Sequence, residues 1–194
     1  MSVEPAIPSI VAITYEYTEA VDVLLVRIAR RLKDAGLRLT GFVQHDEPRE
    51  DRAKCDMVLE ELSGGDRFRI SEDRGRHARG CRLNADWLLK ASTVVRGTLF
   101  EGPDALVLNK YGKVEAEGGG FRDLIALSLE LGVPILIAVP CRNLDSWRAY
   151  AGGMSMDLRF SDDPAFVDRV CGFFAPKFGI VAAAATRDDA VRPD

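Results

Sequence analysis

Short apolar runs alternate with amphipathic segments along most of the chain. The first run, Ile10 to Thr14, is apolar and β-branched, as buried strands are. Residues 21–32 then carry apolar side chains at helical spacing with arginines between them, and Gly36 is expected to end this helix. Leu37 to Val43 predicts a second strand. The order strand, helix, strand predicts a βαβ unit whose two strands pair in parallel.

A β-hairpin is predicted in the next part of the chain. Strand-like runs over 57–62 and 67–71 flank the turn sequence SGGD, so we expect a hairpin insertion at about 55–72. The charged residues 46–54 before it predict a loop. Asn84 is suited to cap the helix that follows the hairpin.

The alternation of strands and helices continues to the C-terminal part of the chain. Strands are predicted at 105–108 and 133–139, and the polar, glycine-rich residues 109–120 predict a long connection between them. The predicted helices here are 121–132, 144–150 and one that begins at Asp163-Pro164. This order predicts an α/β fold with a mostly parallel sheet. Ligands bind beyond the carboxyl ends of such strands, so the loops after the first, third and fourth strands are the candidate site.

Length and composition narrow the class of protein. The 194 residues predict a single domain over 1–181 and a disordered tail over 182–194. Hydrophobic residues make up 47% and charged residues 29%, which is typical of a soluble globular protein. The net charge of −4 gives no reason to expect binding to nucleic acid. Since no apolar run approaches the ~20 residues that span a membrane, we expect a cytoplasmic protein without membrane insertion.

The four cysteines are widely scattered and form no C-x-x-C pair. A structural zinc site is therefore not expected, and buried free thiols are the simplest interpretation. Cys81 lies among arginines, where positive charge lowers the pKa of a thiol and raises its reactivity. A redox or soft-metal role for Cys55, Cys81 and His77 is the alternative.

Several segments follow one another in an order found in a known family. They are residues 36–42 (GLRLTGF), the turn Ser63-Gly64-Gly65, residues 79–84 (RGCRLN), residues 104–115 (DALVLNKYGKVE) and Phe121. Together they resemble the thermophile-type nucleoside-triphosphatase family, a group of small P-loop ATPases and GTPases. The resemblance runs from about Val11 to Val139. It implies a P-loop-NTPase-like three-layer α/β sandwich with an inserted hairpin.

A narrower resemblance is carried by residues 54–59 (KCDMVL), 80–83 (GCRL) and 107–113 (VLNKYGK). These segments are similar to a bacterial family known mainly as a domain of unknown function. Its genes are often found near molybdate-transport and nitrogenase genes. The resemblance implies molybdenum metabolism as the context and implies no particular reaction.

The stretch that corresponds to the phosphate-binding loop departs from the P-loop pattern. A P-loop needs glycines that let backbone N–H groups surround the phosphates, a lysine, and a serine or threonine for Mg²⁺. Residues 14–22 (TYEYTEAVD) contain no glycine, with Val21 at the lysine position and Asp22 at the serine/threonine position. The stretch also holds three acids, and like charges a few ångströms apart repel by ~1–4 kcal/mol. We therefore interpret it as a degenerate Walker A motif.

The Walker B region has changed as well. Asn109 and Lys110 stand where an ATPase of this type has one acid for Mg²⁺ and another for the attacking water. An asparagine still accepts a hydrogen bond from metal-bound water, but a lysine is no substitute for a carboxylate base. Glu115 is retained and is a candidate catalytic base if the protein is an enzyme. Ordinary P-loop hydrolysis is therefore not expected.

Two features near this loop are suited to an anion. Residues 67–82 contain six arginines and two acids, a net charge of +4, and arginines bind phosphate, carboxylate or an oxyanion with forked contacts. The alternative is a solvated face that pairs with the acidic loop. Gly118, Gly119 and Gly120 open a helix whose backbone N–H groups attract anions. Here the alternative is a mobile surface loop.

The leading hypothesis is a non-hydrolytic accessory protein of bacterial molybdenum metabolism. It binds an anionic small ligand, either a nucleotide or an oxyanion such as molybdate or tungstate, at the rebuilt loop. The predicted ligand-binding residues are Tyr15, Tyr17, Asp22, Arg76, Arg79, Arg82, Asn109, Lys110, Lys113, Gly118, Gly119 and Gly120. The two tyrosines either fill the space that phosphates occupy in relatives or stack on a base.

Two other hypotheses stay open. The first is a divergent Mg²⁺-dependent nucleoside triphosphatase or nucleotide transferase, with Glu115 as the base and Asp22 as a ligand of the metal. The second is an interaction module, for example a homo-oligomer, that keeps the fold and has lost the ligand.

Overall fold

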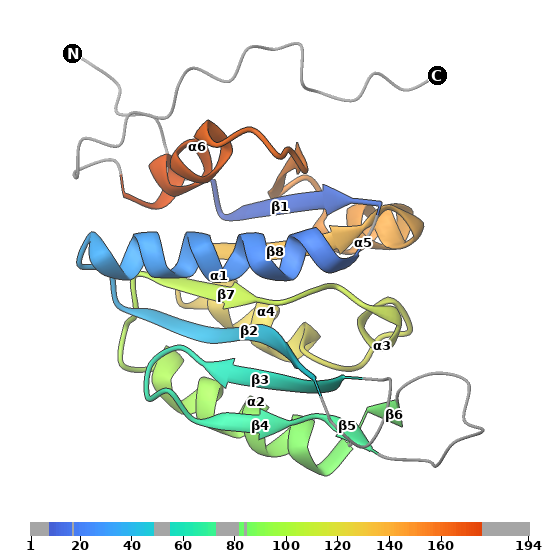
Figure 1. Ribbon diagram of the computed structural model, residues 1–194. Helices are drawn as coiled ribbons and strands as arrows, with labels where there is room; N and C mark the ends of the chain where they lie inside the picture. The colour runs from blue at the N-terminus through green and yellow to red at the C-terminus, as the bar shows by residue number, and fades with distance from the viewer. Residues whose placement is uncertain (1–7, 17, 49–54, 73–81, 84, 176–194) are drawn as a thin grey trace, which may run out of the picture.

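In the computed structural model, a seven-stranded sheet lies between two layers of helices (Figure 1). The structure describes residues 8–16, 18–48, 55–72, 82–83 and 85–175. In spatial order the strands are β4 (Arg67–Arg69), β3 (Asp56–Glu61), β2 (Leu39–Glu47), β7 (Ala105–Leu108), β8 (Ile135–Pro140), β1 (Ile10–Tyr15) and β9 (Ser155–Arg159). Five neighbouring strands pair in parallel, in the order β2, β7, β8, β1 and β9. At the other side of the sheet, β3 pairs antiparallel with β2 and with β4, which completes the hairpin. The short strands β5 (Ser71–Glu72) and β6 (Arg82–Leu83) form a separate pair.

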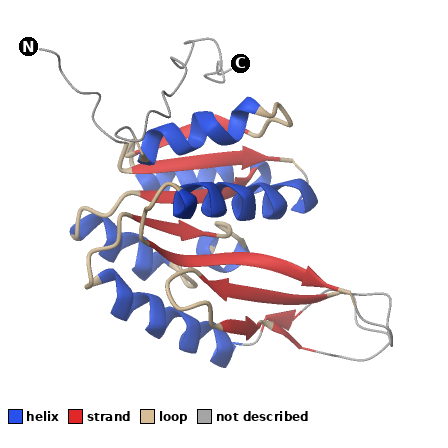
Figure 2. Cartoon of the chain, turned by 60° about the vertical axis from the view of Figure 1, so that its left-hand side comes forward, coloured by secondary structure: helices blue, strands red, loops and turns tan. Residues whose placement is uncertain are grey.

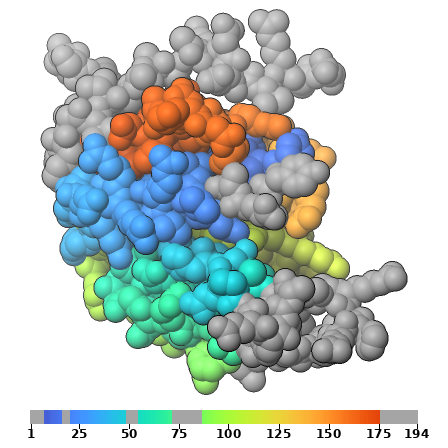
Figure 3. Space-filling model, in the orientation of Figure 1, coloured from blue at the N-terminus to red at the C-terminus, as the bar shows by residue number. Residues whose placement is uncertain are grey.

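Each face of the sheet is covered by its own set of helices (Figures 1 and 2). One face packs against α1 (Thr18–Asp34) and α6 (Ala165–Phe174), which lie side by side as Figure 3 also shows. The other packs against α2 (Ala85–Leu99), α4 (Arg122–Glu130) and α5 (Leu144–Ala151). Alternate residues of each strand divide between the faces, so Val11 and Ile13 contact the α1 layer while Ile10 and Ala12 contact the α4 layer.

The parallel strands are apolar throughout because helices cover both of their faces. Gly41 in β2 shows how tightly two of them approach. It has φ +103°, and a Cβ atom at this position would collide with the carbonyl oxygen of Val107 on β7. Only glycine fits this point of the sheet.

The three-layer α/β fold with an inserted hairpin is as predicted, and several local predictions are wrong. β1 and β2 are not neighbours, because β8 and β7 lie between them. β2 continues to Glu47, into the segment predicted as a loop. The polar connection 109–120 contains a short helix, α3 (Lys113–Ala116), and strand β9 was not predicted.

Two predictions about helix ends have different outcomes. Asp163 Oδ1 accepts a hydrogen bond from Ala165 N at 2.9 Å as a capping side chain does, but α6 begins one residue later than predicted, with Pro164 at the cap position. Asn84 lies outside the described residues, as does the predicted tail at 182–194. None of the helices in the described ranges is long and apolar enough to cross a membrane.

Candidate functional site

Polar side chains gather at the carboxyl ends of the parallel strands. Tyr15 is the last residue of β1, and Asn109 directly follows β7. Gln44 lies in the second half of β2, and Asp22 projects from the start of α1. All four are buried, with 2% of Tyr15, 8% of Asp22, 5% of Gln44 and 3% of Asn109 exposed. Burial of so many polar groups at one edge requires that they find partners.

Five of these side chains form a connected row, which we call the polar chain: Lys110, Asp22, Asn109, Gln44 and Asp46. Lys110 Nζ lies 3.9 Å from Asp22 Oδ1, and the Asn109 amide hydrogen-bonds the Asp22 carboxyl. Asn109 Nδ2 donates to Gln44 Oε1 at 3.1 Å. Gln44 Nε2 in turn donates to Asp46 Oδ1 at 3.0 Å. The polar chain therefore joins the α1, β7 and β2 segments of the site.

Burial raises the pKa of the Asp22 carboxyl above its usual value. Lys110 opposes this rise in pKa, Asp46 adds to it, and the hydrogen bond from Asn109 lowers it. The folded state therefore holds a proton on Asp22 at pH values where the unfolded chain has lost it.

This pKa shift predicts a pH dependence of stability. Because the folded pKa of Asp22 is raised, stability is lost as the pH rises from the unfolded value near 3.8 through the folded pKa. Asp22→Asn should therefore be more stable relative to the natural chain at pH 7 than at pH 4, because the amide carries no charge that burial disfavours. Urea unfolding across this pH range measures the difference. The exposed Asp34→Asn on the same helix is the control, and an equal gain in that variant would contradict the assignment.

Tyr15 carries a hydroxyl group that stays protonated. Burial, together with the charge of Asp22, raises its pKa to about 12. The charge of Arg142 lowers this pKa, but by less than burial and Asp22 raise it. A neutral phenol is a hydrogen-bond donor. Yet Tyr15 Oη has no hydrogen-bond partner within the described part of the chain.

Two more buried oxygens share this property. Asp22 Oδ1 and Asn109 Oδ1 also lack a hydrogen-bond partner among the described residues. Tyr15 ends β1, Asp22 lies near the start of the helix that follows, and Asn109 follows β7, so the three oxygens lie at the same edge of the sheet. They offer one donor and two acceptors to a polar ligand, and carboxylate and amide oxygens are also ligands that suit Mg²⁺.

A second group lies at the ends of β8 and β9. Arg159 Nη2 pairs with Glu16 Oε1 at 3.2 Å, and its Nη1 donates to Cys141 Sγ at 3.4 Å. Arg142 follows Cys141 and is exposed. The pKa of Cys141 is raised by burial and by Glu16, more than Arg159 lowers it, so this sulfur remains a thiol. Nothing in the geometry makes it a nucleophile.

The structure gives Glu115 a role in holding the loop after β7. Its Oε2 accepts a hydrogen bond from Gly112 N at 2.9 Å, and its Oε1 accepts one from Phe121 N at 3.1 Å. Gly120, with φ +61°, lies so close that a Cβ atom there would collide with Glu115 Oε1. Both carboxylate oxygens are thus used by backbone amides.

The other predicted residues are distributed as follows. Gly118, Gly119 and Gly120 are exposed in the loop before α4, and Lys113 is exposed with its Nζ 3.6 Å from Glu117 Oε1. Tyr17, Arg76, Arg79, His77 and Cys81 lie outside the described residues, as does the side chain of Arg82. Of the predicted ligand-binding residues, the structure brings together Tyr15, Asp22, Asn109 and Lys110.

Sequence reasoning missed Gln44, Arg142 and Arg159. Each lies in the carboxyl-terminal half of a parallel strand or just beyond it. Arg142 follows the fourth predicted strand, which was already marked for inspection, so its position was a usable signal. Val21, at the P-loop lysine position, belongs to α1 and is fully buried in the core between this helix and the sheet.

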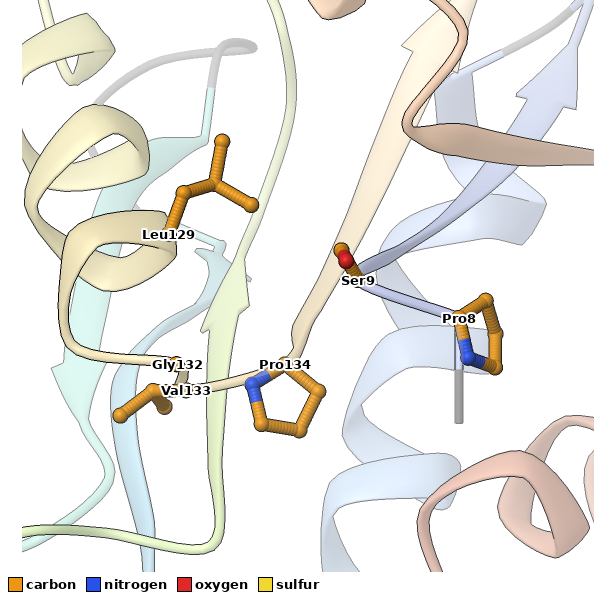
Figure 4. A pocket seen from close by; sticks show the side chains of 6 residues that line it. All are labelled: Pro8, Ser9, Leu129, Gly132, Val133 and Pro134. Carbon is orange, nitrogen blue, oxygen red and sulfur yellow. The ribbon is translucent and has the colours of Figure 1, made fainter. Parts of the chain in front are cut away.

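Two further features limit what the site can be. The described residues contain no group of three or more His, Cys, Asp or Glu side chains arranged to hold a metal ion. The pocket in Figure 4, of about 160 Å³, is lined by Ser9 and Pro134 just before β1 and β8. It therefore lies at the amino ends of the strands, opposite the polar chain.

Comparison with known proteins agrees with this architecture. Over 149 residues the chain is 33% identical to "Molybdenum import ATP-binding protein ModC 2" of Bradyrhizobium diazoefficiens. That match covers 77% of this chain and only 17% of the relative. The crystal structure of THEP1 from the hyperthermophile Aquifex aeolicus superposes with a TM-score of 0.62. The two sequences are 16% identical, and the superposition covers 85% of this chain and 98% of THEP1. The likeness therefore shows a shared fold.

The P-loop-NTPase-like fold predicted from the sequence is therefore confirmed. Residues 10–166 match a family described as "Protein of unknown function (DUF2478)". This match spans every strand of the main sheet and reaches the start of α6. The chain belongs to the DUF2478 family.

Proposed function

We propose that the protein binds an anionic small ligand, a nucleotide or an oxyanion, at the carboxyl edge of its sheet and does not hydrolyse it. We place this activity in bacterial molybdenum metabolism as an accessory function. The name of the Bradyrhizobium relative, a molybdenum import ATP-binding protein, supports both the nucleotide and the molybdenum context. The P-loop-NTPase-like fold supports the location, since ligands of parallel α/β sheets bind at this edge.

The observation that carries the proposal is the set of three buried oxygens that have no hydrogen-bond partner among the described residues. Leaving a buried polar atom unpaired costs about 1–3 kcal/mol, so three of them at one place are costly unless a ligand pairs with them. Tyr15 Oη is suited to donate to a ligand oxygen. Asp22 Oδ1 and Asn109 Oδ1 are suited to accept from hydroxyl or amine groups, or from water around a cation. Lys110 adds positive charge beside them.

Three substitutions support binding without hydrolysis. The P-loop lysine position holds Val21, which belongs to the apolar core. Asn109 and Lys110 replace the two acids that phosphoryl transfer uses to hold Mg²⁺ and orient water. Glu115, the remaining candidate base, has both oxygens bound to backbone N–H groups. Positioning and charge neutralisation, which carry this chemistry, are therefore weak in this chain.

The remaining predicted residues complete the proposed site. Arg76, Arg79 and Arg82 would supply charge from the segment between the hairpin and α2. Tyr17 would pack on the ligand, and Lys113 with Gly118, Gly119 and Gly120 would close over it from the loop before α4. Replacing Arg79 and Arg82 together with alanine tests this part of the assignment, because the double variant should lose anion binding.

The proposal predicts a ligand-dependent shift in thermal stability. A ligand at a hundredfold its dissociation constant adds ~2.7 kcal/mol, which raises the melting temperature by roughly 5–10 °C for a chain of this size. The panel is ATP, GTP, ADP and AMP with and without Mg²⁺, then molybdate, tungstate, sulfate and phosphate. Tyr15→Phe should keep the fold and weaken binding about tenfold, because only the donor is lost.

Tyr150→Phe is the matched control, since its hydroxyl donates to the backbone oxygen of Arg122 away from the polar chain. A panel without any shift would leave the interaction-module hypothesis in place of ours. Mg²⁺-dependent phosphate release that disappears in Glu115→Gln without loss of stability would favour the hydrolase hypothesis instead.

A further inference from the structure

Five residues form a corner at the ends of three adjacent strands, which we call the arginine corner: Tyr15, Glu16, Cys141, Arg142 and Arg159. β1 lies between β8 and β9, so the ends of these strands meet. Tyr15 ends β1, Cys141 and Arg142 directly follow β8, and Arg159 ends β9. Cys141 and Arg142 follow the strand between β7 and β1, so the arginine corner borders the polar chain on that side, while Arg159 lies on the opposite side of Tyr15.

The centre of the corner is a buried hydrogen-bond donor with no acceptor. Tyr15 is 98% buried, since only 2% of it is exposed, and its hydroxyl has no partner in the described ranges. Tyr15 pairs with Pro140 at the end of β8, so Cys141 and Arg142 follow directly after its neighbour in the sheet. A neutral phenol beside an arginine is suited to an oxygen that carries negative charge.

The two arginines of the corner are available to a ligand to different degrees. Arg142 is exposed and makes no ion pair with any described residue. Arg159 is half exposed, and Glu16 holds it through a single surface contact at 3.2 Å. Such surface pairs are weak, so a doubly charged anion competes well for the Arg159 guanidinium.

We propose that the arginine corner binds the tetrahedral, doubly charged oxyanion group of the ligand. This inference rests on the proposed function and adds where the charged group sits. The guanidinium groups of Arg142 and Arg159 contact its oxygens. Tyr15 Oη donates a further hydrogen bond to it from the buried end of β1. The group is either the terminal phosphate of a nucleotide or a free oxyanion of the same shape.

Glu16 has a distinct part in this arrangement. Its carboxylate occupies Arg159 when no ligand is present, so it competes with the ligand for the same guanidinium. Removing its charge should therefore strengthen binding, whereas removing either arginine should weaken it. Opposite effects from two partners of one ion pair are not expected from a purely structural contact.

Isothermal titration of the full chain tests this proposal, with sodium molybdate and ADP as separate probes. Arg142→Ala and Arg159→Ala should each raise the dissociation constant tenfold or more, as expected for charge-assisted hydrogen bonds. Glu16→Gln should lower it about threefold. Arg148→Ala is the matched control, because Arg148 is also half exposed and also holds a single acid, Asp157 at 3.1 Å. Its dissociation constant should stay within twofold of the natural chain.

The outcomes separate this inference from the proposed function. Tight binding of either probe that none of the corner variants changes would overturn the arginine corner and leave the proposed function standing. Absence of binding of both probes to the natural chain would overturn both. If the arginine variants lose only molybdate binding, the corner binds a free oxyanion. If they lose only ADP binding, the corner binds a nucleotide phosphate.

Discussion

Gly41→Ala is expected to lower the free energy of unfolding by about 3–5 kcal/mol. The alanine methyl group would overlap the carbonyl oxygen of Val107, a backbone atom of the neighbouring strand that has no room to move. Its φ of +103° adds strain of its own. A loss of this size is a large share of the ~5–15 kcal/mol that holds a domain folded. Urea unfolding followed by circular dichroism measures it.

Two other glycines separate the causes of this effect. Gly65 has φ +80° and open space around it, so Gly65→Ala should cost only about 1 kcal/mol from backbone strain. Gly97 lies in α2 with open space and ordinary helical backbone, so Gly97→Ala should gain up to ~1 kcal/mol. If Gly41→Ala were no worse than Gly65→Ala, the close approach of β2 and β7 would be wrong.

Glu115→Ala is expected to lower the free energy of unfolding by about 3–6 kcal/mol. Its carboxylate accepts hydrogen bonds from Gly112 N and Phe121 N, and Phe121 is buried. Hydrogen bonds to a charged acceptor contribute about 1.5–3 kcal/mol each, and the alanine variant loses both. Glu115→Gln keeps one acceptor oxygen and should lose about half as much. Thermal and urea unfolding of both variants check the order.

The control for Glu115 is the exposed Glu117, which directly follows α3 and pairs with Lys113. Glu117→Ala should change stability by no more than about 0.5 kcal/mol. Glu115 variants with natural stability would contradict the structural role that its hydrogen bonds indicate. They would return this residue to the list of candidate bases.

The sequence predicted best the elements whose local pattern matches their final environment. β7 and β8 are short apolar runs because they are buried on both faces, so composition alone reveals them. β9 was missed because its sequence, SMDLR, has one well-buried apolar residue, Leu158. Its place is set by pairing with β1, which lies more than 140 residues earlier.

The same reasoning explains the error about β1 and β2. A strand–helix–strand pattern fixes the direction of the crossover and leaves open how many strands are later inserted between its two strands. Two strands, β7 and β8, are inserted here. That order depends on packing across the whole sheet and is not carried by the first 43 residues.

Part of the candidate site was predictable because it follows the P-loop register. The positions that hold Mg²⁺ or orient water in a P-loop NTPase are occupied here by Asp22, Asn109 and Lys110. The structure brings these three residues together. Arg159 was not predictable, because it ends a strand that was itself missed. Glu115 looked like a candidate base from its position, and only its contacts with two backbone amides reveal its role in the loop.

The position of β1 also bears on how the chain is made. β1 is synthesised long before both of its partners, β8 and β9. At ~5–20 residues per second, β1 waits roughly 7–28 s before its second neighbour is synthesised. During that time an apolar strand has both edges open, which is the situation in which nascent chains aggregate or recruit chaperones. Synthesis from the N-terminus therefore leaves the β8-β1-β9 side of this sheet to be completed last.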